Sequence, residues 1–212
     1  MTEDKAEASV LKKLQIETPQ KAIRTLLFVV IGAAILAVVY SIPMPYIMVS
    51  LFPFGLAPTF AVIAVAGAVR GPLAGLLTGY LGTVVYYLLF FNTIVSFTLP
   101  ALAYGLLGFI AGIPSYDFSR GRSLGKLSII AAIGLVFTAL LVVVIGLYVE
   151  DYATLAAIGF VLLRLLTLGL PSAVLLTPLF ARAWLIVSTR VTLSSRATTA
   201  ARDLDKVGQV LI

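Results

Sequence analysis

The chain has no cysteine and no histidine, and acidic residues are scarce, with 9 Asp and Glu among 212 residues against 15 Lys and Arg. Without Cys or His, the sequence excludes disulfides, thiol catalysis, His-based metal sites and Ser-His triads. It contains no G-x-x-x-x-G-K-S/T phosphate loop, so the chain is not itself an ATPase. Because no apolar run carries an Asp or Glu, acid–base chemistry would rest on Tyr or Arg alone. We therefore expect neither an enzyme nor a cofactor.

Charged residues of both signs are few. They make up 11% of the chain, whereas a typical soluble domain holds about 25%, and 61% of the residues are hydrophobic. This composition predicts a polytopic membrane protein with a single domain. We expect an N-terminal tail over 1–21, a transmembrane domain over 22–188 and a C-terminal tail over 189–212. The N-terminal tail reads equally well as a short surface helix or a frayed end. The net charge of +6 does not indicate nucleic acid, since almost all basic residues lie beside apolar runs.

The apolar runs predict six helices, over 22–42, 54–69, 72–91, 97–113, 127–149 and 153–187. Pro43 and Pro45 end the first helix, and Arg70-Gly71-Pro72 forms a tight turn, because proline is tolerated in the first turn of a helix but not in its interior. The charge-free loop over 43–53 is either a lid or an interfacial connector that holds Tyr46. The last run is about 50 Å long and exceeds the hydrocarbon core of about 30 Å, so we expect prolines within it to kink it.

The basic residues set the orientation. With six spans, fourteen of the fifteen Lys and Arg residues fall on one side of the membrane. The charged residues on the other side are the two acids Glu150 and Asp151. Since basic loops stay in the cytoplasm, this pattern predicts six transmembrane helices in the plasma membrane with both termini cytoplasmic.

The fifteenth basic residue, Arg164, lies about eleven residues into the last helix, or roughly 16 Å along its axis. An arginine at mid-membrane costs from about 3 to more than 10 kcal/mol, so it needs a partner or a watery cavity. The candidates are an anionic ligand, backbone carbonyls freed near Pro171, or Glu150 and Asp151 reached by snorkelling. The polar side chains expected to line an outward-facing ligand site with Arg164 are Tyr40, Tyr86, Asn92, Tyr104 and Tyr148. Each Tyr has packing or interfacial anchoring as its alternative role.

Small residues mark two helix faces. Gly75, Gly79 and Gly82 share one face of the helix over 72–91 and would let another backbone approach closely. Ala33-x-x-x-Ala37 is a small-x-x-x-small pair, for which periodicity alone favours packing inside the same subunit.

The stretch GPLAGLLTGYLG at Gly71–Gly82 resembles the substrate-specificity (S) subunits of energy-coupling-factor (ECF) vitamin transporters. These are six-helix proteins with both termini inside and a glycine-proline turn before a glycine-rich third helix. The resemblance implies capture of a vitamin or related small metabolite from outside, and pairing with a transmembrane coupling subunit and two cytoplasmic ATPases. It also makes Ala33 and Ala37 similar to the first-helix alanine motif that docks the coupling subunit. Thr83-Val84-Val85 stands where many such proteins carry an acidic residue, and the resemblance does not name the substrate. Arg164 favours an anionic one.

Two other functions stay open. A structural membrane protein of similar helical architecture, such as a cell-shape scaffold subunit, would bind cytoskeletal or wall-synthesis proteins and no small ligand. A membrane enzyme would turn over a lipid substrate through Tyr or Arg.

Overall fold

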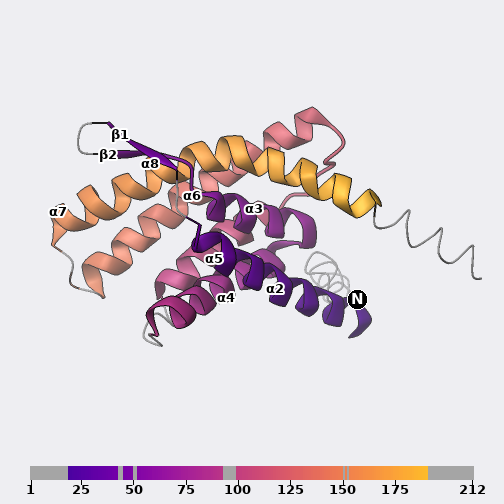
Figure 1. Ribbon diagram of the computed structural model, residues 1–212, viewed down its shortest axis with the longest axis horizontal. Coiled ribbons are helices and arrows are strands. Elements are labelled where there is room, and N and C mark those ends of the chain that lie inside the picture. The colour runs from indigo at the N-terminus through magenta and orange to yellow at the C-terminus, as the bar shows by residue number, and fades with distance from the viewer. Residues whose placement is uncertain are drawn as a thin grey trace, which may run out of the picture.

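The computed structural model describes residues 19–42, 45–49, 52–92, 99–149, 151 and 153–190. Helices predominate in these ranges (Figure 1): α2 (Pro19–Tyr40), α3 (Pro58–Arg70), α4 (Pro72–Phe91), α5 (Leu99–Gly112) and α6 (Gly121–Tyr148). A final helix runs from Thr154 to Arg190 and contains α7 (Thr154–Ala156), the π-helical η2 (Ala157–Leu162), α8 (Leu163–Pro171) and the π-helical η3 (Ser172–Leu176). Two strands, β1 (Tyr46–Val49) and β2 (Phe52–Gly55), lie between α2 and α3.

Four helices of the described ranges, α2, α4, α6 and the final helix, are long and apolar enough to cross a membrane. The shorter helices α3 and α5 are also apolar. This part of the chain is therefore consistent with an all-α membrane protein. The predicted tails lie largely outside the described residues, as does the predicted turn after Asn92.

Helix boundaries follow local chemistry. The bounds predicted for α4 are confirmed, because Pro72 suits the first helical position and Asn92 adopts the left-handed conformation that ends the helix, with φ 51°. The predicted start of α6 at 127 is wrong. This helix begins at Gly121, because the polar residues that follow include good helix formers such as Arg122 and Lys126. The predicted start of α3 at 54 is also wrong, because Phe54 belongs to a strand.

Glycines bring α3, α4 and α5 into direct backbone contact. A Cβ added at Gly75 would collide with the Gly108 carbonyl group and with Cα of Gly67, and one added at Gly108 would lie 2.5 Å from the Gly75 carbonyl carbon. One turn further, a Cβ at Gly79 would lie 2.9 Å from Cα of Gly105. The prediction that a neighbouring backbone approaches these glycines is confirmed for Gly75 and Gly79, where α5 is a neighbour. It is wrong for Gly82, which meets the Leu36 side chain instead.

The remaining helices surround this centre. α2 packs on α4, where Leu36 lies against Gly82, and the final helix packs on α6, where Leu135 lies against Gly169. The largest apolar core joins α2, α3, α5, α6 and the final helix around fully buried residues that include Leu36, Ile63, Leu107 and Leu135.

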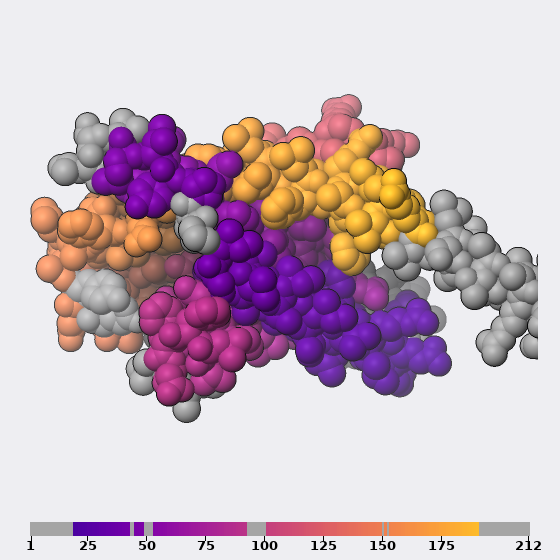
Figure 2. All heavy atoms as spheres, in the orientation of Figure 1, coloured from indigo at the N-terminus to yellow at the C-terminus, as the bar shows by residue number. Residues whose placement is uncertain are grey.

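The predicted loop over 43–53 is in part a β-hairpin. β1 and β2 pair antiparallel, with Tyr46 opposite Gly55 and Met48 opposite Pro53, and β2 contacts α8. Proline is compatible with this position because a two-stranded sheet has only edge strands. Figure 2 shows the hairpin lying across the final helix at one end of the molecule.

The two ends of the molecule differ in charge. The start of α2 and the end of the final helix lie at one end, opposite the hairpin and α7 (Figure 1). At the basic end, aromatic and polar contacts connect different helices. Arg70 Cζ lies 6.0 Å from the Phe28 ring centroid, and the Phe28 and Trp184 rings meet edge-on with centroids 5.7 Å apart. Arg182 Nη1 donates a hydrogen bond to the Ser119 carbonyl at 3.5 Å. Every Lys and Arg of the described ranges except Arg164 lies toward this end.

Candidate functional site

Arg164 lies on α8, and its level in the bundle follows from the packing against α6. Leu135 of α6 meets Gly169, and Val142 belongs to a cluster on which Leu165 packs. The two helices therefore run antiparallel in a register that places Arg164 beside the middle of the apolar part of α6.

The Arg164 side chain is exposed and does not point into the helix bundle. Within the described ranges its guanidinium has no ion-pair or hydrogen-bond partner, and only its backbone carbonyl accepts a bond, from Thr167 Oγ1 at 3.4 Å. Neither a hydrogen bond from the guanidinium to backbone carbonyls near Pro171 nor an ion pair with Asp151 is therefore present in the described ranges. Glu150, the other acid expected within reach, lies outside the described residues. The final helix is π-helical over Ser172–Leu176, directly after Pro171.

The hairpin is attached to the final helix by one buried side chain. Ser172 Oγ accepts a hydrogen bond from the Ala57 backbone N–H at 2.5 Å and donates one to the Leu168 carbonyl at 2.8 Å. Ala57 precedes the first turn of α3 and has no side-chain cap of its own, so Ser172 satisfies a donor that the helix start leaves open. The Leu56 N–H closes the base of the hairpin by donating to the Pro45 carbonyl at 3.1 Å.

A groove of about 490 Å³ lies between β2 and the final helix. Its lining is almost wholly apolar and consists of Phe54, Leu166, Thr167, Leu170, Pro171, Val174 and Leu175. Arg164 follows the helical spacing i, i+3, i+7 with Thr167 and Pro171, so it shares their face of α8 and lies one turn beyond the groove. The arrangement offers a cation at one end of an apolar groove.

The tyrosines predicted for the site form a separate aromatic group. Tyr40 stacks on Tyr86 with ring centroids 4.8 Å apart, and its hydroxyl lies 3.4 Å from Thr83 Oγ1. Tyr104 packs against Phe60 at 6.0 Å. Tyr40 and Tyr104 both lie against the largest apolar core, which is the packing role held open for them.

The last two predicted site residues lie apart from both groups. Asn92 is exposed at the end of α4, and Tyr148 is 82% exposed at the end of α6. The structure thus brings Tyr40 and Tyr86 together, but it does not bring the tyrosines to Arg164. The sequence analysis did not identify Phe54 and Thr167, which line the groove. The i, i+3 spacing from Arg164 to Thr167 indicates that these two residues share a helix face, so Thr167 could have been predicted.

Ala33 and Ala37 occupy the buried side of α2, each only 4% exposed, and α2 packs on α4 and α3. A coupling subunit would reach them only if α2 moved away from the helices that cover this side. The exposed side of α2 carries larger apolar residues instead: Ile23, Leu26, Leu27, Val30, Ile31, Ile35 and Val38.

Among the described residues, no three His, Cys, Asp or Glu side chains gather where they could hold a metal ion. No protein-family model, curated protein or solved structure matches the chain. The argument for function therefore rests on the site and on the sequence pattern.

Proposed function

We propose that the chain is the substrate-binding membrane subunit of an ECF-type importer, with six transmembrane helices and both termini in the cytoplasm. It captures a vitamin or related small anionic metabolite from outside. A transmembrane coupling subunit and two cytoplasmic ATPases supply the energy, since the chain has no phosphate loop of its own.

The observation that carries this proposal is Arg164, an exposed cation without a partner in the described ranges, beside an apolar groove. The six-span prediction puts this level of the final helix near mid-membrane. Arginine at this depth is costly unless an anion or water compensates its charge. A substrate carboxylate provides that compensation, and a charge-assisted hydrogen bond contributes about 1.5–3 kcal/mol. The apolar part of the substrate then lies along the groove under Phe54.

The hairpin supplies the element that opens and closes this groove. It reaches α8 through β2, and its base is tied to the final helix by Ser172. Movement of β2 away from α8 would open the groove. The charged groups of the described ranges lie mainly at the basic end, which favours placing that end in the cytoplasm and the hairpin outside.

The proposal is tested by thermal unfolding of the purified protein with a panel of vitamins. A ligand that binds only the folded state raises Tm, and at a fixed ligand concentration the shift grows with the logarithm of its affinity. We expect a carboxylate such as biotin, pantothenate, niacin or folate to raise Tm, and cationic thiamine to leave it unchanged. Arg164→Gln should weaken binding of the active compound about tenfold to a hundredfold. Arg190→Gln, which removes a charge far from the groove, should not. Equal affinities in the two variants would show that the site lies elsewhere.

A further inference from the structure

A second groove, of about 940 Å³, lies at the basic end, where the segment after α5 enters α6. Most of its exposed lining surface is apolar, although polar and cationic side chains contribute to it. The lining residues are Ser115, Tyr116, Asp117, Arg120, Arg122, Ser123, Gly125, Lys126, Ile129 and Ile130. It belongs neither to the hairpin groove nor to the aromatic group around Tyr40.

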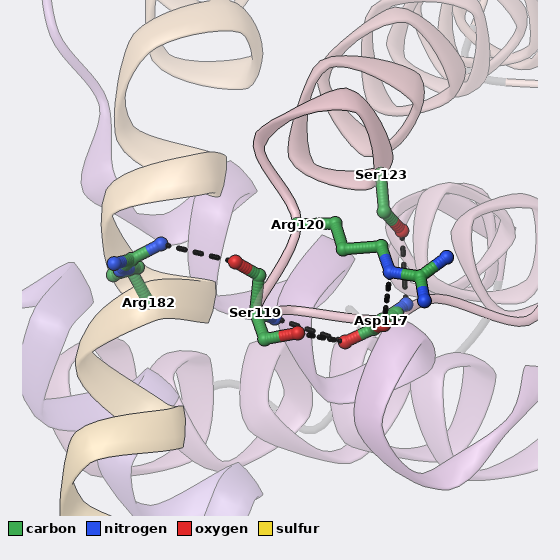
Figure 3. A network of polar contacts seen from close by, with 5 residues as sticks. All are labelled: Asp117, Ser119, Arg120, Ser123 and Arg182. Carbon is green, nitrogen blue, oxygen red and sulfur yellow. Dashed lines mark hydrogen bonds and ion pairs between the residues drawn. The ribbon is translucent and has the colours of Figure 1, made fainter.

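Hydrogen bonds fix one wall of this groove (Figure 3). Asp117 accepts bonds from the backbone N–H and hydroxyl of Ser119, at 3.1 and 2.5 Å, and pairs with Arg120 Nε at 3.1 Å. Its own backbone N–H donates to Ser123 Oγ at 2.9 Å. The hydrogen bonds from Ser119, together with the positive charge of Arg120, lower the pKa of the Asp117 carboxyl below its ordinary value. The wall is therefore ordered by the chain itself, and Arg120 is already matched by an acid.

Two further cations have no such match. Arg122 and Lys126 lie one turn apart on α6, both exposed. Within the described ranges Arg122 has no partner, and the Lys126 ammonium lies 5.8 Å from the Tyr116 ring centroid. The Tyr116 hydroxyl is buried with no hydrogen-bond partner in the described ranges, and burial raises its pKa, so it stays a proton donor. The groove thus presents positive charge that no acid of the described ranges matches.

An apolar row continues from these two cations along α6. The exposed residues follow at helical spacing and are all large and hydrophobic: Ile129, Ile133, Phe137, Leu140 and Val144. From Ile129 to Val144 the row is about 22 Å long, comparable to most of a hydrocarbon core. On this face of α6, the positive charges of Arg122 and Lys126 therefore lie directly beside the start of the apolar row at Ile129.

We propose that this groove and row bind an anionic phospholipid, with its phosphate at Arg122 and Lys126 and an acyl chain along Ile129, Ile133 and Phe137. A soluble phosphate or an acidic peptide would use the charges and leave the apolar row without a role, whereas a phospholipid uses both. Basic residues at the membrane surface attract anionic headgroups in this way. The inference needs only that the chain lies in a membrane and does not depend on the proposed substrate.

Native mass spectrometry of the full chain in detergent tests the headgroup contact, with dioleoylphosphatidylglycerol as the probe and dioleoylphosphatidylcholine as the neutral comparison. Each cation near an anionic surface contributes roughly fivefold, so Arg122→Gln with Lys126→Gln should weaken phosphatidylglycerol binding about thirtyfold. The matched control, Arg24→Gln with Arg190→Gln, removes two charges from the same end outside the groove and should change binding less than about threefold. Equal losses in the two double variants would overturn the proposal.

Two further measurements separate the lipid from other anions. Ile129→Ser should weaken phosphatidylglycerol binding several-fold, whereas Val144→Ser, on the same face but in the other half of the row, should not. Soluble glycerol phosphate should fail to displace the lipid from the unmodified protein. Displacement of phosphatidylglycerol by micromolar glycerol phosphate, or equal effects of the two serine variants, would show that the site binds anions without contacting the acyl chain.

Discussion

Replacing Gly108 by alanine tests the packing that holds the bundle together. An added Cβ would lie 2.5 Å from the Gly75 carbonyl carbon and 2.8 Å from its Cα, where ordinary contact begins near 3.4 Å. The backbones of α4 and α5 would have to separate by about 1 Å, and overpacking of this kind costs about 1–3 kcal/mol. We expect the upper part of this range, since Gly67 of α3 also contacts Gly108 and moves with it.

Gly159→Ala is the matched control. This glycine is also helical, but nothing lies within 4 Å of its added Cβ, so the variant should gain up to about 1 kcal/mol from helix propensity. Thermal unfolding in detergent measures the difference in stability between the two variants. At roughly 2–4 °C per kcal/mol for a chain of this size, Gly108→Ala should unfold on the order of 5–10 °C below Gly159→Ala. Equal midpoints for the two variants would refute the close approach of α4 and α5.

Two further predictions concern α2 and the hairpin. Ala33→Trp should prevent stable folding because the residue is buried inside the helix bundle, whereas Ile35→Trp on the exposed side of α2 should be tolerated. Stable, monodisperse Ala33→Trp protein would return this position to a docking role. Ser172→Ala leaves the Ala57 N–H without its partner and should lower the free energy of unfolding by about 1–3 kcal/mol, measured by thermal unfolding, whereas Ser128→Ala removes only a bond to its own helix and should have little effect.

The sequence predicts α4 and the glycine contacts well, because local rules decide them. Pro72 and Asn92 mark the ends of α4, and only glycine permits two helix backbones to touch. The separation of basic residues toward one end could likewise be predicted from the spacing of charges along the chain. These features need no knowledge of which helix lies beside which.

The hairpin and the role of Ala33 and Ala37 could not be predicted in the same way. Tyr46–Val49 shows no alternation of polar and apolar residues, so it lacks the two-residue pattern that would predict a strand. A small-x-x-x-small pair predicts close packing but does not identify the helix that approaches it. In this chain both alanines are buried within the subunit, where α2 packs on α4 and α3.

The candidate site was predicted in part. Arg164 stands out in the sequence because of the cost of its charge in an apolar helix. Its neighbours Phe54 and Thr167 become apparent only once β2 is placed on α8. The tyrosines were grouped with Arg164 by depth alone, and depth does not say which side of the bundle a side chain faces.

The central claim is that the chain binds a small anionic metabolite through Arg164. Mass spectrometry of the small molecules released when gently purified protein is denatured tests it most directly. The account predicts a stoichiometric anionic compound from the unmodified chain and from Arg190→Gln, reduced at least about tenfold in Arg164→Gln. A chain that stays empty after incubation with the vitamin panel would contradict the account and favour a structural scaffold, and equal release from both variants would remove Arg164 from the site.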